Sequence, residues 1–184
     1  MATKPFKKGA TYDDLREVPE HLVAEMFDGE LWAFPRPALR HANTASSLLA
    51  EIHRSFHRND PGGWVILLEP ELHFGRDVLV PDIAGWRRTR LPEVPDEAYL
   101  SLAPDWICEV LSPSTEAVDR GKKLRIYARE GVPHAWLIDP AARSLEVLSL
   151  EAGRWTPSAR HADAAKVRAV PFDALELEIH TLWS

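Results

Sequence analysis

Apolar and polar positions repeat along the chain with two different periods, which predict both helices and strands. Over residues 41–57 the apolar side chains recur at intervals of three and four positions, so they share one face of a helix. Residues 119–130 are expected to form a second helix that ends at Gly131, since glycine commonly follows the last turn. A short helix is expected after Thr11, because Thr11 and Asp14 have the spacing of a capping box. The shared apolar face of the longest helix consists of Ala45, Leu48, Leu49, Ile52 and Phe56.

Short apolar runs bounded by turn residues predict the strands. An Asp-Gly dipeptide at 28–29 joins two such runs, residues 22–27 and 30–34, and it is a strong signal for a two-residue hairpin turn. Residues 106–111 are apolar at nearly every position, which is expected of a central strand with both faces covered. A glycine- and proline-rich break is expected at 59–63. The remaining expected strands are 64–68, 71–74, 78–84, 135–138, 145–150 with a partner around 155, and 175–179.

The order of these elements, hairpins first and then strand–helix–strand, predicts the fold class. We expect an α/β protein with a mixed β-sheet flanked by helices and an additional N-terminal hairpin. A length of 184 residues suits one domain over residues 1–184, with residues 1–10 expected to be flexible. Residues 87–103 are expected to form a surface excursion. The content of 45% hydrophobic and 27% charged residues argues against long disorder as the main state.

The net charge and the cysteine content exclude some classes of function for this protein. The formal net charge is −6, from 22 basic and 28 acidic side chains, which argues against a histone-like coat for nucleic acid. An enzyme that meets phosphates through a carboxylate-bound metal ion is compatible with this charge. Cys108 is the only cysteine, so no intramolecular disulfide can form. No apolar run follows the lysines of residues 1–8, and no stretch approaches the roughly 18 residues of a membrane span, so we expect a cytoplasmic protein without membrane contact.

Two acids, Asp82 and Glu109, stand inside apolar strands, where an unpaired charge costs several kcal/mol. Strand alternation places Glu109 on one face with Ile107 and Leu111. A carboxylate in such a place needs a cation, a metal ion or a proton. For either acid alone, the alternative interpretation is a buried arginine–glutamate pair or an acid that faces water at a strand end.

Taken together, the two acids indicate a metal site. Pro81 removes a backbone donor just before Asp82 and loosens the sheet there. An opened strand end lets a carboxylate reach an ion, and two carboxylates with a carbonyl and waters suit Mg²⁺. The backbone carbonyl of Val110, next to Glu109, is the expected third ligand.

A lysine in the following helix completes the pattern. Lys123 shares a helix face with Ile126, Tyr127 and Glu130, beside the buried stripe, so it is better placed than Lys122 to point inward. Next to a metal-bound water, a lysine can orient the water or stabilise charge that develops at phosphorus. A solvated helical lysine is the alternative interpretation.

These residues also carry a resemblance to a known family, the Uma-type restriction endonucleases. That family was long classed only as a domain of unknown function, and it is a branch of the PD-(D/E)XK nuclease superfamily. The resemblance covers roughly residues 10–180 and is most specific over residues 104–140, whereas residues 24–30 and His41 match more loosely. The residues that carry it are Val80-Pro81-Asp82, residues 104–115 around Glu109, residues 119–123, Tyr127, Gly131-Val132 and residues 136–139.

The resemblance implies a restriction-endonuclease-like fold and hydrolysis of DNA phosphodiester bonds that depends on Mg²⁺ or Mn²⁺, by enzymes that often act as homodimers. It also implies that Asp82 and Glu109 are metal ligands and that Glu25 is an additional acid of the site. The superfamily's lysine is expected two residues after the acid, where this chain has Leu111. The resemblance therefore assigns the role of that lysine to Lys123 in the next helix.

Other polar residues near the two acids are weaker candidates for the functional site. Three arginines after the Asp82 strand either contact the backbone of DNA or decorate a surface loop. Another Pro-Asp pair, at 104–105, competes with Asp82, but its acid is four residues from Glu109. That spacing is about 13 Å along a strand, too far for one shared ion. His41 either approaches the site or is solvated, and the second is the usual case for a histidine at a helix start. The three arginines are Arg87, Arg88 and Arg90.

The favoured interpretation is a metal-dependent DNA endonuclease with a site of two carboxylates and a lysine. The alternative is a catalytically inactive nuclease-like domain that binds DNA or protein. Leu111 at the usual lysine position and the negative net charge support that alternative. A hydrolase of small phosphate esters is a third interpretation.

Overall fold

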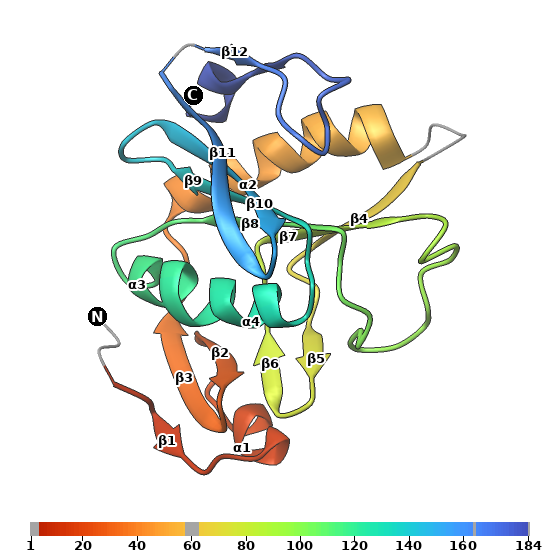
Figure 1. The fold of residues 1–184 in the computed structure, drawn as a ribbon. Coiled ribbons are helices and arrows are strands. Elements are labelled where there is room, and N and C mark those ends of the chain that lie inside the picture. The colour runs from red at the N-terminus through yellow and green to blue at the C-terminus, as the bar shows by residue number, and fades with distance from the viewer. Residues whose placement is uncertain (1–3, 58–62, 164, 184) are drawn as a thin grey trace.

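Two main β-sheets, with helices packed on the larger one, make up the fold in Figure 1. The structure is a computed structural model that describes residues 4–57, 63–163 and 165–183. The expected α/β class, with a mixed sheet flanked by helices, is confirmed. The helices are α1 (Tyr12–Arg16), α2 (Leu39–Ile52), α3 (Glu116–Val118) and α4 (Leu124–Arg129). The strands are β1 (Lys7–Lys8), β2 (Leu22–Phe27), β3 (Glu30–Pro35), β4 (Trp64–Leu68), β5 (Leu72–Phe74), β6 (Asp77–Leu79), β7 (Ile83–Arg87), β8 (Trp106–Val110), β9 (His134–Asp139), β10 (Ser144–Glu151), β11 (Arg154–Ala162), β12 (Lys166–Val167) and β13 (Leu177–Glu178).

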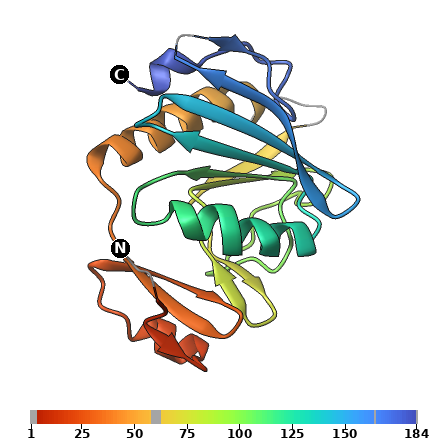
Figure 2. The ribbon, with the colours of Figure 1, turned by 60° about the vertical axis from the view of Figure 1, so that its left-hand side comes forward.

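The larger sheet has the strand order β11-β10-β9-β8-β7-β4, in which β8 and β9 are parallel and the other neighbours are antiparallel. All five residues of β8 are buried, as expected for a central strand. Alternate side chains of β8 enter two apolar clusters, because successive residues of a strand face opposite ways. Ile107 packs in one cluster with Tyr127 of α4, and Trp106 packs in the other with Leu48 of α2. The two helices therefore cover opposite faces of this sheet, as Figure 2 shows.

The smaller sheet is antiparallel throughout and has the order β1-β3-β2-β6-β5. Its central hairpin turns at Asp28 and Gly29, whose φ angles of 56° and 75° are those of the predicted tight turn. Glu25 of β2 lies opposite Trp32 of β3. Within the first ten residues, which the sequence leads us to expect as flexible, β1 pairs with β3.

The expectation of one continuous strand over residues 78–84 is wrong. The segment divides into β6 and β7, which belong to different sheets. Pro81 has no N–H to continue a ladder, and the neighbouring backbone groups bond elsewhere. The Val80 N–H donates to Glu25 Oε1 at 2.7 Å, and the Asp82 carbonyl accepts from the Glu69 N–H at 3.0 Å. The chain thus passes from one sheet to the other at residues 80–82.

The helix expected over residues 119–130 begins earlier and is not uniform. It starts at Glu116, passes through a π-helical turn at Asp119–Lys123 and continues as α4. Such π turns occur often at functional sites. Gly131 follows the helix with a φ of +75°, as predicted for a terminating glycine.

The remaining expectations are met in most places. The capping box at Thr11 and Asp14 forms, and the closing hairpin is β10 and β11. The last strand is shorter than the expected 175–179, because only β13 pairs, with β12. Most of the break expected at 59–63 lies outside the described residues. No helix in the described part of the chain is long and apolar enough to span a membrane.

Candidate active site

A cavity of about 80 Å³ opens where the chain crosses between the two sheets. Its walls come from β2, β3, the β3–α2 connector, the β4–β5 turn, the 80–82 crossing, β8 and the π turn. The break after β6 exposes one end of β7, and β8 ends beside it, so acids from separate elements reach the same space. The polar side chains that line the cavity are Glu25, His41, Glu69, Asp82, Glu109, Thr115, Asp119 and Lys123.

Lys123 lies at the centre of this cluster and is only 3% exposed. Its Nζ lies 3.0 Å from both carboxylate oxygens of Glu109 and 3.0 Å from Glu25 Oε1. It also donates to the Val80 carbonyl at 3.1 Å and lies 3.6 Å from Asp119 Oδ1. Burial alone would lower the pKa of this amine, but the surrounding carboxylates outweigh burial and hold its pKa well above the usual range. Lys123 is therefore a buried ammonium group.

Glu109 and Asp119 are buried acids whose ionised forms are costly. Burial raises the pKa of the Glu109 carboxyl well above its usual range, although the Lys123 ammonium opposes the shift. Glu109 Oε1 also accepts a hydrogen bond from the Tyr127 hydroxyl at 2.8 Å. Burial raises the pKa of Asp119 to about 6, against the opposing effects of Lys123 and of a hydrogen bond with Thr115. A further positive charge in the cavity would therefore stabilise the ionised forms of these acids.

Asp82 is oriented by its neighbours toward the cavity. Its Oδ2 accepts the Val110 N–H at 2.6 Å, and His41 Nε2 lies 3.3 Å from its Oδ1. The Asp82 side chain is 16% exposed, so it remains accessible from the cavity. Burial lowers the pKa of His41, but the bonds to Asp82 and to the Val110 backbone outweigh burial and raise it. Two elements, α2 and β8, thus fix one carboxylate.

The chemistry of the donor set suits a divalent cation. Five carboxylates line the cavity beside one lysine, so acidic groups are in excess; they are those of Glu25, Glu69, Asp82, Glu109 and Asp119. Oxygen ligands of this kind are those that Mg²⁺ prefers. Within residues 4–57, 63–163 and 165–183, no three His, Cys, Asp or Glu side chains are gathered into a ready-made metal cage. The set resembles the usual Mg²⁺ site, in which a few carboxylates leave other positions to water and substrate.

The four side chains that the sequence singles out lie in one cavity: Glu25, Asp82, Glu109 and Lys123. Lys122 points elsewhere, with its Nζ 5.2 Å from the ring centre of Trp32 and 3.5 Å from Glu30. Leu111, at the usual lysine position, is a core residue. The choice of Lys123 over Lys122 as the inward lysine is therefore confirmed.

Three further residues belong to the cluster, although the sequence patterns did not assign them to the site. Asp119 lies four residues before Lys123 and Tyr127 four residues after it, which is a spacing that could have revealed them. The expectation of a solvated His41 is wrong, because His41 is buried against Asp82. No local signal separates that histidine from an exposed one, since its partner is distant in sequence.

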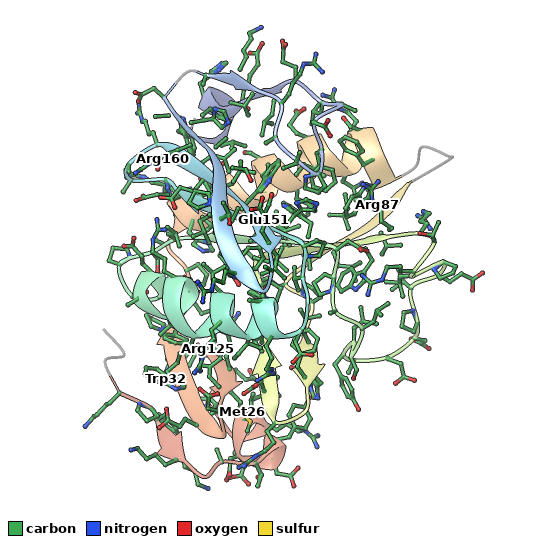
Figure 3. The ribbon with its side chains drawn as sticks, in the orientation of Figure 1. Met26, Trp32, Arg87, Arg125, Glu151 and Arg160 are labelled. Carbon is green, nitrogen blue, oxygen red and sulfur yellow. The ribbon has the colours of Figure 1, made fainter. Side chains whose placement is uncertain are left out.

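The three arginines at and after the end of β7 are not brought to the cavity. Arg87 lies at the other end of β7 from Asp82, with its guanidinium 4.1 Å from the Trp64 ring centre, and Figure 3 shows it far from Trp32. Arg90 pairs with Asp105 at 2.8 Å. Arg88 donates to the Pro92 carbonyl at 3.3 Å. A role of these arginines in DNA binding stays a prediction.

Replacing Asp119 with asparagine is expected to stabilise the metal-free protein at neutral pH. The folded pKa of about 6 lies above the ordinary value of 3.8, so the stability that this group contributes is greatest below the ordinary pKa and is lost as pH rises past 6. The variant avoids that loss, which amounts to roughly 2–3 kcal/mol at about 1.4 kcal/mol per pKa unit. Urea unfolding in EDTA, at about pH 4 and about pH 7.5, measures it. An equal gain at both pH values would contradict the prediction.

Comparisons with known proteins identify the family and the fold of the chain. A family model described as "Uma2: Putative restriction endonuclease" matches residues 10–180. No curated protein matches the chain. The fold is similar to the crystal structure of "a putative nuclease belonging to DUF820" from Anabaena variabilis ATCC 29413, with a TM-score of 0.75 and 24% identity over 95% of this chain and 97% of that chain. The resemblance seen in the sequence is confirmed, and because the match spans residues 10–180 of 184, the chain belongs to the Uma2 family.

Proposed function

We propose that the protein is a metal-dependent endonuclease that hydrolyses phosphodiester bonds in DNA. The observation that supports this proposal is the meeting of Asp82 and Glu109 with the Lys123 amine in one cavity, although the three come from different elements. Membership of the Uma2 family points to the same reaction.

In this proposal the carboxylates of Asp82 and Glu109 and the carbonyl of Val110 would hold Mg²⁺ or Mn²⁺. When bound, the ion supplies charge neutralisation at the phosphate and lowers the pKa of water. The protein's own groups do the rest of the positioning. The Val110 N–H and His41 fix the Asp82 carboxylate, and the Tyr127 hydroxyl fixes Glu109. Fixed groups of this kind need no reorganisation when charge develops.

Lys123 is proposed to orient the attacking water or to stabilise the charge that develops on the phosphate. Its position in the π turn brings Nζ to 3.0 Å from Glu109, the acid that the superfamily pattern pairs with its lysine. The side chain at the usual position, Leu111, packs in the core instead. This proposal gives the role of the usual lysine to a long side chain from a neighbouring element.

Incubation of the purified protein with plasmid and single-stranded DNA tests the proposal. Cleavage is expected with Mn²⁺ or Mg²⁺ and not with EDTA. Glu109→Gln is expected to lose at least about 10²–10³-fold in rate, because the amide still accepts from Tyr127 but no longer offers a charge to the ion. Glu116→Gln, which changes an exposed acid on α3, is the matched control and keeps its activity. Equal cleavage by wild type and Glu109→Gln would mean contamination or a misplaced site.

A second candidate is a nuclease-like domain that binds DNA or protein without catalysis. The observation that favours it is that Lys123 already pairs with Glu25, Glu109 and Asp119 and so partly neutralises the cavity. Calorimetric titration with Mn²⁺ separates the two functions. A catalytic site binds the ion with an affinity that falls in Asp82→Ala, whereas a scaffold shows no binding in either protein.

A further inference from the structure

The cavity is too small to hold a nucleotide base. Its volume of about 80 Å³ is roughly half that of a 150 Å³ protein cavity that accepts benzene. An ion, its waters and one phosphate oxygen fit in such a space, but a base and its sugar do not. A nucleic-acid strand that presents a phosphate to the carboxylates must therefore lie across the mouth of the cavity.

One side of the mouth is formed by residues 35–41, which run from the last residue of β3 into the first turn of α2 and which we call the connector. Pro35, Pro37 and His41 of this connector line the cavity. Between them stand Arg36 and Arg40, both exposed. Figure 2 shows the connector as a segment of backbone on the outside of the molecule, which runs from the smaller sheet up to α2. We call Arg36 and Arg40 together the arginine rim.

The arginine rim lies in a stretch of the chain that contains no acid. Residues 31–50 contain no aspartate or glutamate, whereas the whole chain has 28 acids in 184 residues. Glu69, the exposed acid among the residues that line the cavity, comes from the turn between β4 and β5 and not from the connector. A polyanionic strand is therefore expected to approach the connector, which carries positive charge without neighbouring acids.

The guanidinium groups of the rim are open to a ligand. Other arginines of the protein form ion pairs with carboxylates, as Arg90 does with Asp105. Within the described residues, no carboxylate lies within ion-pair distance of Arg36 or Arg40. Arg36 donates from Nη2 to the Glu20 carbonyl at 2.6 Å, which holds it in place and leaves its other donors available. Leu39 between them is 89% exposed, so the chain itself does not cover this turn.

We infer that the arginine rim binds the phosphates that flank the reacting one and so holds a DNA strand across the mouth of the cavity. This inference rests on the proposed function, because it places the reacting phosphate at Asp82 and Glu109. The neighbouring phosphates of the same strand then fall outside the cavity, beside the connector. An arginine can form two parallel hydrogen bonds to a phosphate, which suits it to this task.

Metal-free binding of fluorescently labelled oligonucleotides, single-stranded and duplex, tests the rim. The double variant Arg36→Gln/Arg40→Gln is compared with Arg16→Gln/Arg154→Gln, two exposed arginines on α1 and β11. Both double variants make the net charge of −6 more negative by two, so they differ only in position. Loss of the rim is expected to raise Kd about tenfold or more, while the control stays within about twofold. The slope of log K against log salt is expected to become shallower by about 1.4–1.8 for the rim variant alone.

Equal effects of the two double variants, or no effect of either, would overturn the inference. So would a wild-type protein that binds neither oligonucleotide. Cleavage assays with Mn²⁺ separate this result from the proposed function. If the wild type cleaves DNA and the rim variant binds and cleaves like the control, the rim is wrong and the nuclease stands. If the wild type binds DNA through the rim but cleaves none, the rim stands and the nuclease proposal fails.

Discussion

Lys123→Met is expected to lower stability by about 3–5 kcal/mol and to abolish nuclease activity. The lysine is the ammonium group nearest to Glu109 and Glu25, and its removal leaves their buried charges without a partner. Breaking a buried ion pair on one side costs this much because the remaining charge stays desolvated. Activity is expected to fall at least about 10³-fold, since the group proposed to act at the phosphate is lost.

The adjacent lysine supplies a matched control. Lys122 has the same side chain on the same helical turn, but it is 30% exposed and contacts Glu30 and Trp32. Lys122→Met is expected to cost less than about 1 kcal/mol, as exposed ion pairs do, and to keep activity. Urea denaturation curves measure both variants, and near-UV circular dichroism shows which of them is folded in the activity assay. If Lys123→Met were as stable as Lys122→Met, the Lys123 amine would not be the group that stabilises the buried acids.

Asp82→Asn is expected to reduce the cleavage rate by about 10²–10⁴-fold while it changes stability by less than about 1 kcal/mol. The amide oxygen can still accept the Val110 N–H, so the local structure is retained. The charge that would hold the ion is lost. The loss of rate without loss of stability is the expected mark of a residue that acts on the ion and the substrate.

Asp105 also directly follows a proline, but we expect the opposite outcome when it is replaced. Asp105 accepts the Arg87 N–H at 2.8 Å and pairs with Arg90. Asp105→Asn is therefore expected to cost about 1–2 kcal/mol in stability and to leave the cleavage rate unchanged. Rates per folded molecule, with stability from urea unfolding, distinguish the two variants. Loss of activity in Asp105→Asn with full activity in Asp82→Asn would reverse the assignment of the site.

The sequence predicts well those features that depend on local periodicity. The Asp-Gly turn at 28–29 needs positive φ at both positions, which few residue pairs adopt, so the hairpin follows from two residues. The central position of β8 follows from its apolar content on both faces. The inward direction of Lys123 follows from its helical phase relative to Ile126 and Tyr127.

Features that depend on contacts between distant segments could not be predicted in the same way. Pro81 signals an interruption, but only the pairing of β6 and β7 with different partners shows that the chain changes sheet there. Similarly, the burial of His41 depends on Asp82, which is 41 positions away in the chain. A short-range sequence pattern predicts neither the change of sheet nor the burial of the histidine, because both depend on elements that are far away in the sequence.

By itself, therefore, the sequence determined the types of most elements, the turn at 28–29, the two acids that interrupt apolar runs and the lysine that faces inward. Only the tertiary structure decided that Glu25, Asp82, Glu109 and Lys123 share one cavity, that Asp119, Tyr127 and His41 join them, and that Arg87 does not. The physical reason is that periodicity depends on neighbours within a few residues. A charged cluster depends on the packing of two sheets and a helix, whose relative placement is set by the whole core.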